Sequence, residues 1–348
     1  MSRVPIPVIP NRTPDQESER RLLEIRKEAE TRGMVSGKGI LPEGAPFPRA
    51  TPQTGYYGIP MLKEPQWTWE VPLYFFVGGA AGAASIIATV ARLREADPEL
   101  IRSARWVAAA GGAISPVLLI SDLGRPARFI NMLRVFKPSS PMSVGSWLLA
   151  GYGPVAGAAA VSEVTGILPA AGAAATLGAG LLGPAIATYT AALICDTAVP
   201  AWHAGYREMP YVFAGSAASA AGGMGLLATA LDAAEPARRL AVLGAGAELV
   251  AKRRLIKRLA TPGPASLSEP YETGRAGVML RVAEGLTAGG LAGALLGRRS
   301  RALSALSGAS LLAASALTRF GIFEAGMASA RDPKYTIVPQ RQRQDGRL

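Results

Sequence analysis

Residues 71–90 read VPLYFFVGGAAGAASIIATV, a run without a single charged side chain. A helix of about 20 apolar residues is long enough to cross the hydrocarbon core of a bilayer. A helix of a soluble protein would carry polar residues on its exposed face, whereas this run is apolar around its whole circumference. The stretch therefore predicts a transmembrane helix. Glycines at four-residue spacing, which let helices approach closely in lipid, occur here and near the C-terminus at Gly78, Gly82, Gly285, Gly289, Gly293 and Gly297.

Further apolar runs follow this first one along the chain. They lie at about residues 106–120, 143–161, 170–195, 212–231, 240–249, 278–296 and 303–320. The run at 240–249 is the weakest, because it is short, contains Glu248 and leads into the basic residues Lys252, Arg253 and Arg254. We expect eight spans, with seven as the alternative. The predicted fold class is an all-α membrane protein, a bundle of about eight transmembrane helices with an extended polar N-terminal segment.

Polar segments flank this apolar body. The expected boundaries are a polar, Pro-rich N-terminal extension at 1–68, the helical bundle at 69–325 and a basic C-terminal tail at 326–348. Within the extension, residues 15–31 predict a short charged helix, either solvated or docked on a partner subunit. The prolines within residues 41–65 favour an extended strap. Arg20 and Arg21 precede charged residues rather than the apolar stretch of an export signal, so we expect no cleavable signal.

The chain has a net charge of +12, and its basic residues lie mostly in the loops between apolar runs. This distribution favours membrane topology over nucleic-acid binding. With eight spans, the side of the N-terminal extension collects more Lys and Arg than the other side. Its basic residues include Arg125, Arg128, Arg134, Lys137, Arg207, the cluster 252–258, Arg331 and Lys334. The positive-inside rule predicts a multi-pass protein of the bacterial inner (cytoplasmic) membrane with both termini in the cytoplasm.

The chain holds one histidine, His203, and one cysteine, Cys195. A b-type haem between two histidines, or an iron–sulfur cluster on several thiolates, needs more ligands than these two residues supply. We therefore expect no haem, no iron–sulfur cluster and no metal in this chain. If the protein takes part in electron transfer, the redox groups must then belong to a partner subunit or to a diffusible substrate.

Three segments carry a family signature. They are WEVPLYFF at 69–76, SDLGRPARFINMLRVFKPSSPMSVGSW at 121–147 and YTAALICDTAVPAWH at 189–203. The second segment is long for a mere connection between two spans. Together the three closely resemble the NrfD/PsrC family of integral membrane, quinone-interacting subunits. The resemblance covers residues 67 to about 225, and only the number of spans supports it beyond that point.

The resemblance implies a membrane subunit of a respiratory oxidoreductase complex that is not catalytic alone. Such subunits pass electrons between a ferredoxin-like four-cluster iron–sulfur subunit and membrane quinone, either menaquinone or ubiquinone. A molybdopterin-containing or other catalytic subunit usually completes the complex. In the family the quinone lies near the start of the first span, beside the iron–sulfur partner, which on this chain implicates Glu70 and Tyr74.

Quinone reduction consumes two electrons and two protons, so a quinone site needs hydrogen-bond donors for the carbonyl oxygens and a proton relay. Tyr189 and Asp196 are seven residues apart and share one helical face, while Pro200 is expected to end that helix before His203. Ionisable groups at membrane depth indicate function by default. The expected catalytic residues are Glu70, Tyr74, Asp196 and His203, and the expected quinone-binding residues are Trp69, Glu70, Tyr74, Asp122, Arg125, Tyr189 and Trp202.

Several of these residues have a second interpretation. Trp69 and Tyr74 also fit as interfacial anchors. Asp122 also fits as the ion-pair partner of Arg125 and Arg128, and the basic loop residues fit as a grip on an acidic partner subunit. Two alternatives to quinone chemistry remain for the whole chain, namely an ion or proton transporter and a passive membrane anchor. Proton translocation coupled to quinone chemistry is a further option, with Glu163, Asp232 and Glu284 as candidates for a path.

Overall fold

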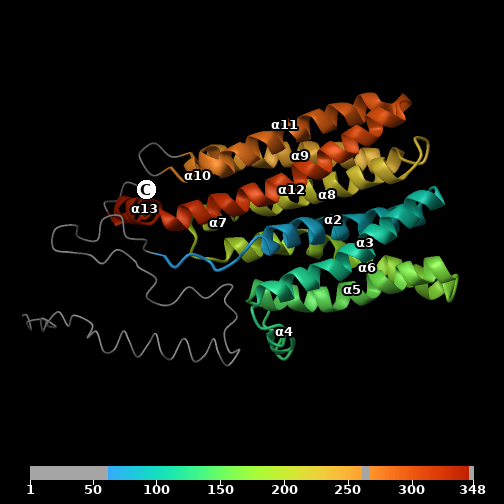
Figure 1. The fold of residues 1–348 in the computed structure, drawn as a ribbon, viewed down its shortest axis with the longest axis horizontal. Coiled ribbons are helices and arrows are strands. Elements are labelled where there is room, and N and C mark those ends of the chain that lie inside the picture. The colour runs from blue at the N-terminus through green and yellow to red at the C-terminus, as the bar shows by residue number, and fades with distance from the viewer. Residues whose placement is uncertain (1–61, 261–265, 345–348) are drawn as a thin grey trace, which may run out of the picture.

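The protein is a bundle of long, nearly parallel helices (Figure 1), and its computed structural model describes residues 62–260 and 266–344, with side chains up to residue 340. The long helices are α2 (Glu70–Leu93), α3 (Pro98–Asp122), α5 (Pro141–Thr165), α6 (Pro169–Cys195), α8 (Met209–Ala228), α9 (Glu235–Leu259), α11 (Gly274–Leu296) and α12 (Arg301–Arg331). The short ones are α4 (Arg128–Met132), α7 (Pro200–Ala204), α10 (Glu269–Glu272), the 3-10 helix η1 (Gly297–Arg299) and α13 (Lys334–Gln344). These residues contain no strand, which confirms the all-α class. The predicted helix at 15–31 lies outside them.

Seven of the described helices are long and apolar enough to cross a membrane. They are α2, α3, α5, α6, α8, α11 together with η1, and α12. The prediction of transmembrane helices is therefore confirmed. The weak run predicted at 240–249 lies within α9, which carries more charged residues than the seven apolar helices. α9 extends over 25 residues, about 37 Å, yet is not among the seven. It packs along α8 and α11, so eight long helices run between the two ends of the bundle (Figure 1).

The helices form two groups of four. α2, α3, α5 and α6 make one group, and α8, α9, α11 and α12 make the other (Figure 1). α2 joins the groups, because it packs against α8 and α12 as well as against α3 and α6. Its central position is reflected in its burial, since 67% of its most apolar window is buried inside the protein.

Small residues set the closest helix contacts. A methyl group on Gly82 would meet the backbone of Gly183 on α6, and Gly223 of α8 meets Gly308 of α12 in the same way. The predicted packing role is thus confirmed for Gly82. It is wrong for Gly285 and Gly289, around which there is open space within 4 Å, so their faces of α11 point away from the other helices.

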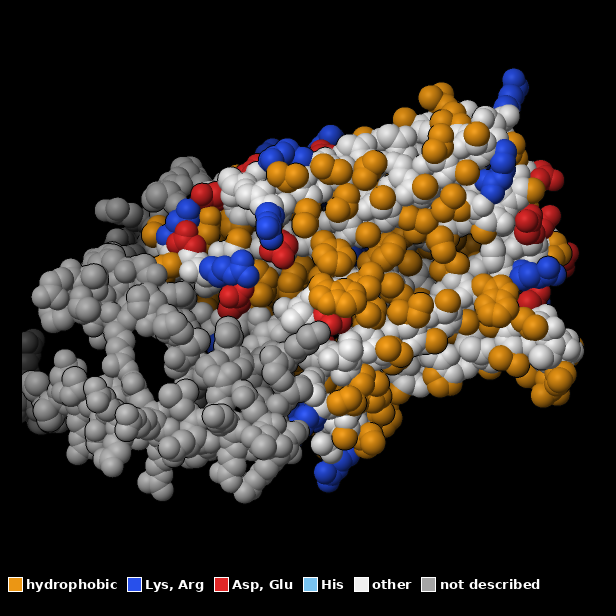
Figure 2. Space-filling view, in the orientation of Figure 1, with side chains coloured by type: hydrophobic (Ala, Val, Ile, Leu, Met, Phe, Trp, Pro, Cys, Tyr) orange, Lys and Arg blue, Asp and Glu red, His pale blue; other side chains and the backbone are white. Residues whose placement is uncertain are grey.

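Charged pairs mark the two ends of the bundle. At the end where α2 begins, Arg258 pairs with Glu208, Lys334 with Glu269, and Arg331 with Glu64. At the other end, Glu163 pairs with Arg105 and Arg102, and Glu235 pairs with Arg239 and Arg298. On the face shown in Figure 2, most charged side chains gather toward these ends, with a largely hydrophobic zone between them. The first described residues and α13 lie at the same end (Figure 1).

Candidate functional site

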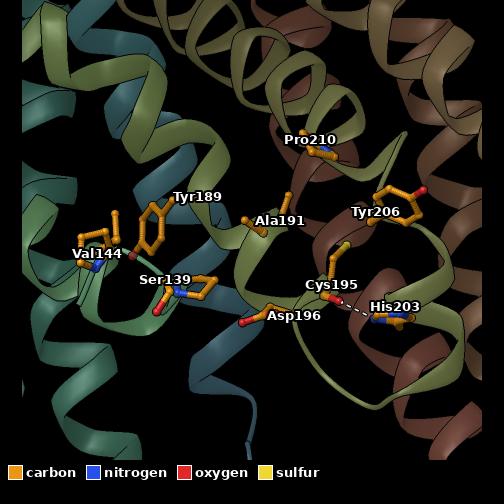
Figure 3. A pocket seen from close by; sticks show the side chains of 12 residues that line it. Ser139, Val144, Tyr189, Ala191, Cys195, Asp196, His203, Tyr206 and Pro210 are labelled. Atoms are coloured by element: carbon orange, nitrogen blue, oxygen red, sulfur yellow. Dashed lines mark hydrogen bonds between the residues drawn. The ribbon is translucent and has the colours of Figure 1, made fainter.

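A cavity of about 550 Å³ opens at the end of the bundle where α2 begins. The loop before α5 and the first turn of α5 form one wall, the last turns of α6 form the second, and α7 with the start of α8 closes the third. Its lining residues are Pro138, Ser139, Pro141, Val144, Tyr189, Ala191, Ala192, Cys195, Asp196, His203, Tyr206 and Pro210. Three expected site residues, Tyr189, Asp196 and His203, therefore share this cavity. Figure 3 shows Tyr189 beside Val144 and Ser139, with His203 and Tyr206 across from it.

The hydroxyl of Tyr189 is buried and has no hydrogen-bond partner among the described residues. Leaving a buried hydroxyl unpaired costs about 1–3 kcal/mol, so such a group marks a place where a ligand or water belongs. The ring of Tyr189 is held by Gly145 on α5, where a methyl group would overlap it. On its other side the ring meets Tyr74 of α2 edge-on, with centroids 6.2 Å apart. The Tyr189 hydroxyl is therefore a fixed, unused donor.

His203 reaches the cavity from α7 rather than from a continuation of α6. The prediction that Pro200 ends the preceding helix is wrong, because α6 already ends at Cys195 and Pro200 instead begins α7. Proline suits that first position because its missing N–H would have no helical partner there. The Nδ1 atom of His203 lies 3.1 Å from the carbonyl oxygen of Cys195. This contact favours a proton on Nδ1, which leaves Nε2 as an acceptor.

Asp196 stands between these two residues. It caps the C-terminus of α6 with its backbone N–H, which donates to Ala192 O at 2.9 Å. Its side chain is exposed and makes no hydrogen bond or ion pair with another described residue. The cavity thus combines a buried phenol with an imidazole and a carboxylate that have access to water, and these are the groups a site needs to donate a hydrogen bond and to move protons.

The two predicted carboxylates of the first spans lie together, outside the lining of this cavity. Thr68 links them, since its backbone N–H donates to Asp122 Oδ1 at 3.3 Å and its hydroxyl contacts both Asp122 and Glu70. The interpretation of Asp122 as an ion-pair partner of Arg125 and Arg128 is wrong for the described residues, where neither arginine forms an ion pair. The Thr68 donors satisfy the carboxylate of Asp122 in place of those arginines.

The other expected binding residues divide between core and surface. Trp202 is fully buried, donates from its indole N–H to Ile322 O at 2.8 Å, and stacks on Trp67 with centroids 5.8 Å apart. It is not among the residues that line the cavity, although His203 next to it in the chain is. Trp69 is 59% exposed at the start of α2, as an interfacial anchor would be. Arg125 is partly exposed in the loop after α3.

Comparison with known proteins identifies the family. Residues 60–240 match the family model "Polysulphide reductase, NrfD", which is more than half of the chain. The chain belongs to this family. It is also similar to the C subunit of the polysulfide reductase of Wolinella succinogenes, with 32% identity over 98 residues. That alignment covers 26% of this chain and 30% of the relative, so it spans less than a third of the relative's length.

This NrfD-family chain also holds a polar cluster that is not among the expected site residues, with Glu248, Thr318 and Arg319 beyond the family match and Ser219 within it. Glu248 of α9 is 1% exposed and accepts hydrogen bonds from Thr318 Oγ1 at 2.7 Å and Ser219 Oγ at 3.3 Å. Arg319, also buried, lies over the ring of Phe213. The sequence signal for this cluster is the place of Glu248 inside an otherwise apolar run, one turn before Lys252.

Proposed function

We propose that this chain is the quinone-reactive membrane subunit of a respiratory oxidoreductase complex. In this role it accepts or delivers electrons through an iron–sulfur partner subunit, and membrane menaquinone or ubiquinone is the diffusible substrate. A molybdopterin-containing or other catalytic subunit would complete the complex. The observation that carries the proposal is the buried, unpartnered hydroxyl of Tyr189 at the wall of a 550 Å³ cavity in an NrfD-family protein.

Binding and orientation would come from the tyrosine side of the cavity. A quinone carbonyl oxygen would accept the hydrogen bond that Tyr189 leaves unused, and the apolar lining from Val144, Ala191 and Ala192 would cover the quinone ring. Tyr74 fixes the tilt of the Tyr189 ring through its edge contact. Glu70 and Asp122, linked by Thr68, sit where the first span begins and are the second proposed group of proton-active residues.

Proton delivery would come from His203 on the α7 wall and from Asp196, which lies between His203 and Tyr189. Reduction of the quinone takes up two electrons from the partner and two protons, and forms one O–H bond on each carbonyl oxygen. His203, with Nε2 free to take a proton from water, and the exposed Asp196 can each receive and pass on one proton. In the direction of quinol oxidation the same groups would accept the protons.

The experiment is a tyrosine exchange in the assembled complex. Tyr189→Phe keeps the ring packed between Gly145 and Tyr74 but removes the unpaired hydroxyl, so the quinone-linked turnover should fall about tenfold, the effect of one lost hydrogen bond. Tyr152→Phe is the matched control, because its hydroxyl is already bonded to Ala81 O at 2.7 Å, away from the cavity. Equal activity of the two variants would contradict the proposal and favour a passive anchor.

Proton translocation is a second candidate function, and the buried cluster around Glu248 favours it. From Glu248 the polar groups continue to Lys252 on the next turn of α9. The Lys252 Nζ lies 3.3 Å from the partly exposed carboxylate of Glu284, near the middle of α11. Glu284 is a predicted member of such a path. Glu163 and Asp232, the other two, lie at the opposite end of the bundle, and Glu163 is paired there with Arg105.

A liposome measurement tests this second candidate. Glu248→Gln preserves the shape of the side chain, and its amide oxygen can still accept from Thr318 while its N–H can donate to Ser219 Oγ, but it removes the titratable group. We expect unchanged quinone turnover with loss of coupled proton movement across the membrane. Glu95→Gln on the α2–α3 turn is the control. A Glu248 variant that moves as many protons per quinone as the unmodified complex would rule out this path.

We also propose the inner membrane as the location, with the end of the bundle where α2 begins, and with it both termini, on the cytoplasmic side. The support is that the basic loop 125–137, the C-terminal part of α9 and α13 all belong to this end. A reporter enzyme that functions only in the cytoplasm should then be active when it is fused after Leu348. Activity of a reporter that functions only outside the cytoplasm would reverse this orientation.

A further inference from the structure

Residues 125–137, in the connection between α3 and α5, form an outlying, exposed segment that does not line the quinone cavity. Its short helix α4 has no buried residue, and it projects sideways beside the start of α5, at the end of the bundle where α2 begins (Figure 1). With the long helices placed across a bilayer, a segment beside the start of α5 lies near the lipid headgroups.

Residues 125–137 carry four basic side chains and no acidic one. These are Arg125, Arg128, Arg134 and Lys137. None of them forms an ion pair with another residue that the structure describes, whereas Arg258, Lys334 and Arg331 at the same end are all paired. A concentration of unpaired positive charge at headgroup depth attracts anionic lipid.

The same segment exposes large apolar side chains among these charges. Ile130 and Val135 are each 69% exposed, and Phe136 is 55% exposed. Phe136 meets Trp147 on α5 in an edge-to-face contact with centroids 6.3 Å apart. Figure 2 shows hydrophobic side chains with Lys or Arg beside them where this segment projects. Apolar groups next to basic ones are typical of a peptide that lies in the membrane interface.

The segment is also held in place rather than loose. Ser143 accepts a hydrogen bond from the Lys137 N–H at 3.0 Å and donates to Val135 O at 3.1 Å. At the other end, Gly124 adopts a positive φ of 65°, the conformation that lets the chain reverse after α3. The charges therefore keep a fixed spacing relative to α5.

We propose that residues 125–137 bind the headgroups of anionic phospholipids, with Ile130, Val135 and Phe136 at the boundary of the acyl chains. Arg128, Arg134 and Lys137 would contact the phosphates. The segment projects sideways beside the start of α5, where lipid surrounds a membrane bundle, and this position favours lipid over an acidic soluble subunit as the group that covers the exposed apolar side chains. The surface would fix the depth of the loop that leads into the cavity wall at Pro138 and Ser139.

An environment-sensitive fluorophore in the intact complex tests the proposal. Cys195 is buried, so Ile130→Cys, or Val135→Cys if the first folds poorly, provides an exposed thiol on this chain for the label, and the complex without the new cysteine gives the background from the other subunits. The complex is then placed in nanodiscs of phosphatidylcholine, with and without phosphatidylglycerol. We expect a blue shift of the emission that depends on phosphatidylglycerol. Lys137→Gln should raise the phosphatidylglycerol content needed for half of this shift about fivefold.

Two further variants complete the design. Combined replacement of Arg128, Arg134 and Lys137 by Gln should abolish the dependence on phosphatidylglycerol. The matched control replaces Arg92, Arg94 and Arg299, three exposed basic residues at the opposite end that form no ion pair in the described part, and it should retain the dependence. Identical emission in both lipids would overturn the proposal. An emission that changes only when the partner subunits are removed would also overturn it, because the segment would then face a subunit rather than lipid.

Discussion

Tyr74 and Tyr189 meet edge-on at 62° between their ring planes, which joins the first helix of one four-helix group to the wall of the cavity. Tyr74 is 2% exposed, so its ring cannot move without disturbing α2. The direction of the Tyr189 hydroxyl thus depends on the packing of both rings and of Gly145. Changes that shift these rings should affect the cavity while leaving the rest of the bundle in place.

Gly145→Ala is the most direct test of this dependence. The added methyl group would overlap the Tyr189 ring, so the hydroxyl should move and quinone-linked turnover should fall about tenfold or more. Gly151→Ala on the same helix is the control, since nothing lies within 4 Å of a methyl group there. Turnover is measured in assembled complexes of equal subunit composition. Equal turnover of both variants would show that the position of Tyr189 does not matter.

Gly326→Ala should reduce stability rather than chemistry. A methyl group on Gly326 of α12 would collide with the fully buried Trp202 ring, and overpacking of this kind costs about 1–3 kcal/mol. The thermal midpoint of the detergent-solubilised protein should therefore fall. Gly285→Ala faces open space and should leave the midpoint unchanged or higher. A Gly326 variant as stable as the Gly285 variant would mean that α7 and α12 do not pack as described.

Arg319→Lys should also destabilise the fold. The Arg319 guanidinium lies with Cζ 3.7 Å from the Phe213 ring centroid and donates to Phe213 O at 2.8 Å. Lysine lacks the planar group that makes both contacts, so we expect a loss of about 2 kcal/mol in the free energy of unfolding. Arg299→Lys, at an exposed position, should be neutral in the same denaturation assay. Comparable stability of both variants would contradict the packing role of Arg319.

The pair between Lys334 and Glu269 should give a small pH-dependent contribution. The hydrogen bond from Lys334 Nζ, at 3.0 Å, lowers the pKa of Glu269, and the same bond raises the pKa of Lys334. The glutamate contribution is present above its unfolded pKa and lost as pH falls through the lowered folded value. The lysine contribution is present below its unfolded pKa and lost as pH rises through the raised folded value.

Lys334→Gln should therefore lower the stability at neutral pH, by about 0.2–1 kcal/mol because both side chains are partly exposed, and the deficit should shrink at acid and at strongly alkaline pH. The measurement is the thermal midpoint of both proteins across pH. A deficit that stays constant as Glu269 becomes protonated would show that the pair contributes nothing through charge.

The sequence predicts the membrane helices well because seven of them carry a signal that is local and continuous. α9 is the exception. Its charged residues are used in contacts with other helices: Glu248 bonds to Thr318, Lys252 donates to Leu280 O, and Arg238 donates to Ala294 O. Hydropathy counts each of these residues against a membrane span, since the partners that satisfy them lie far away in the chain. The predicted run at 240–249 is therefore shorter than the helix.

The candidate site is predictable in part for the same reason. Tyr189, Asp196 and His203 share a cavity because they are close in sequence, and their spacing indicates as much. The side-chain direction of Trp202 depends on Ile322 and Phe323 on the last long helix, and the partner of Asp122 is Thr68, 54 residues earlier. No local pattern specifies such long-range contacts. The catalytic roles themselves remain predictions.

The inward-facing charges of α9 also have a consequence for how the protein is made. A helix with a glutamate at its centre enters a bilayer at considerable cost unless its polar partners are already present. Two of those partners, Thr318 and Arg319, are translated about seventy residues later. Stable insertion of this segment should therefore wait for the last long helix, and a nascent chain truncated before residue 301 should leave it accessible to protease at the membrane surface.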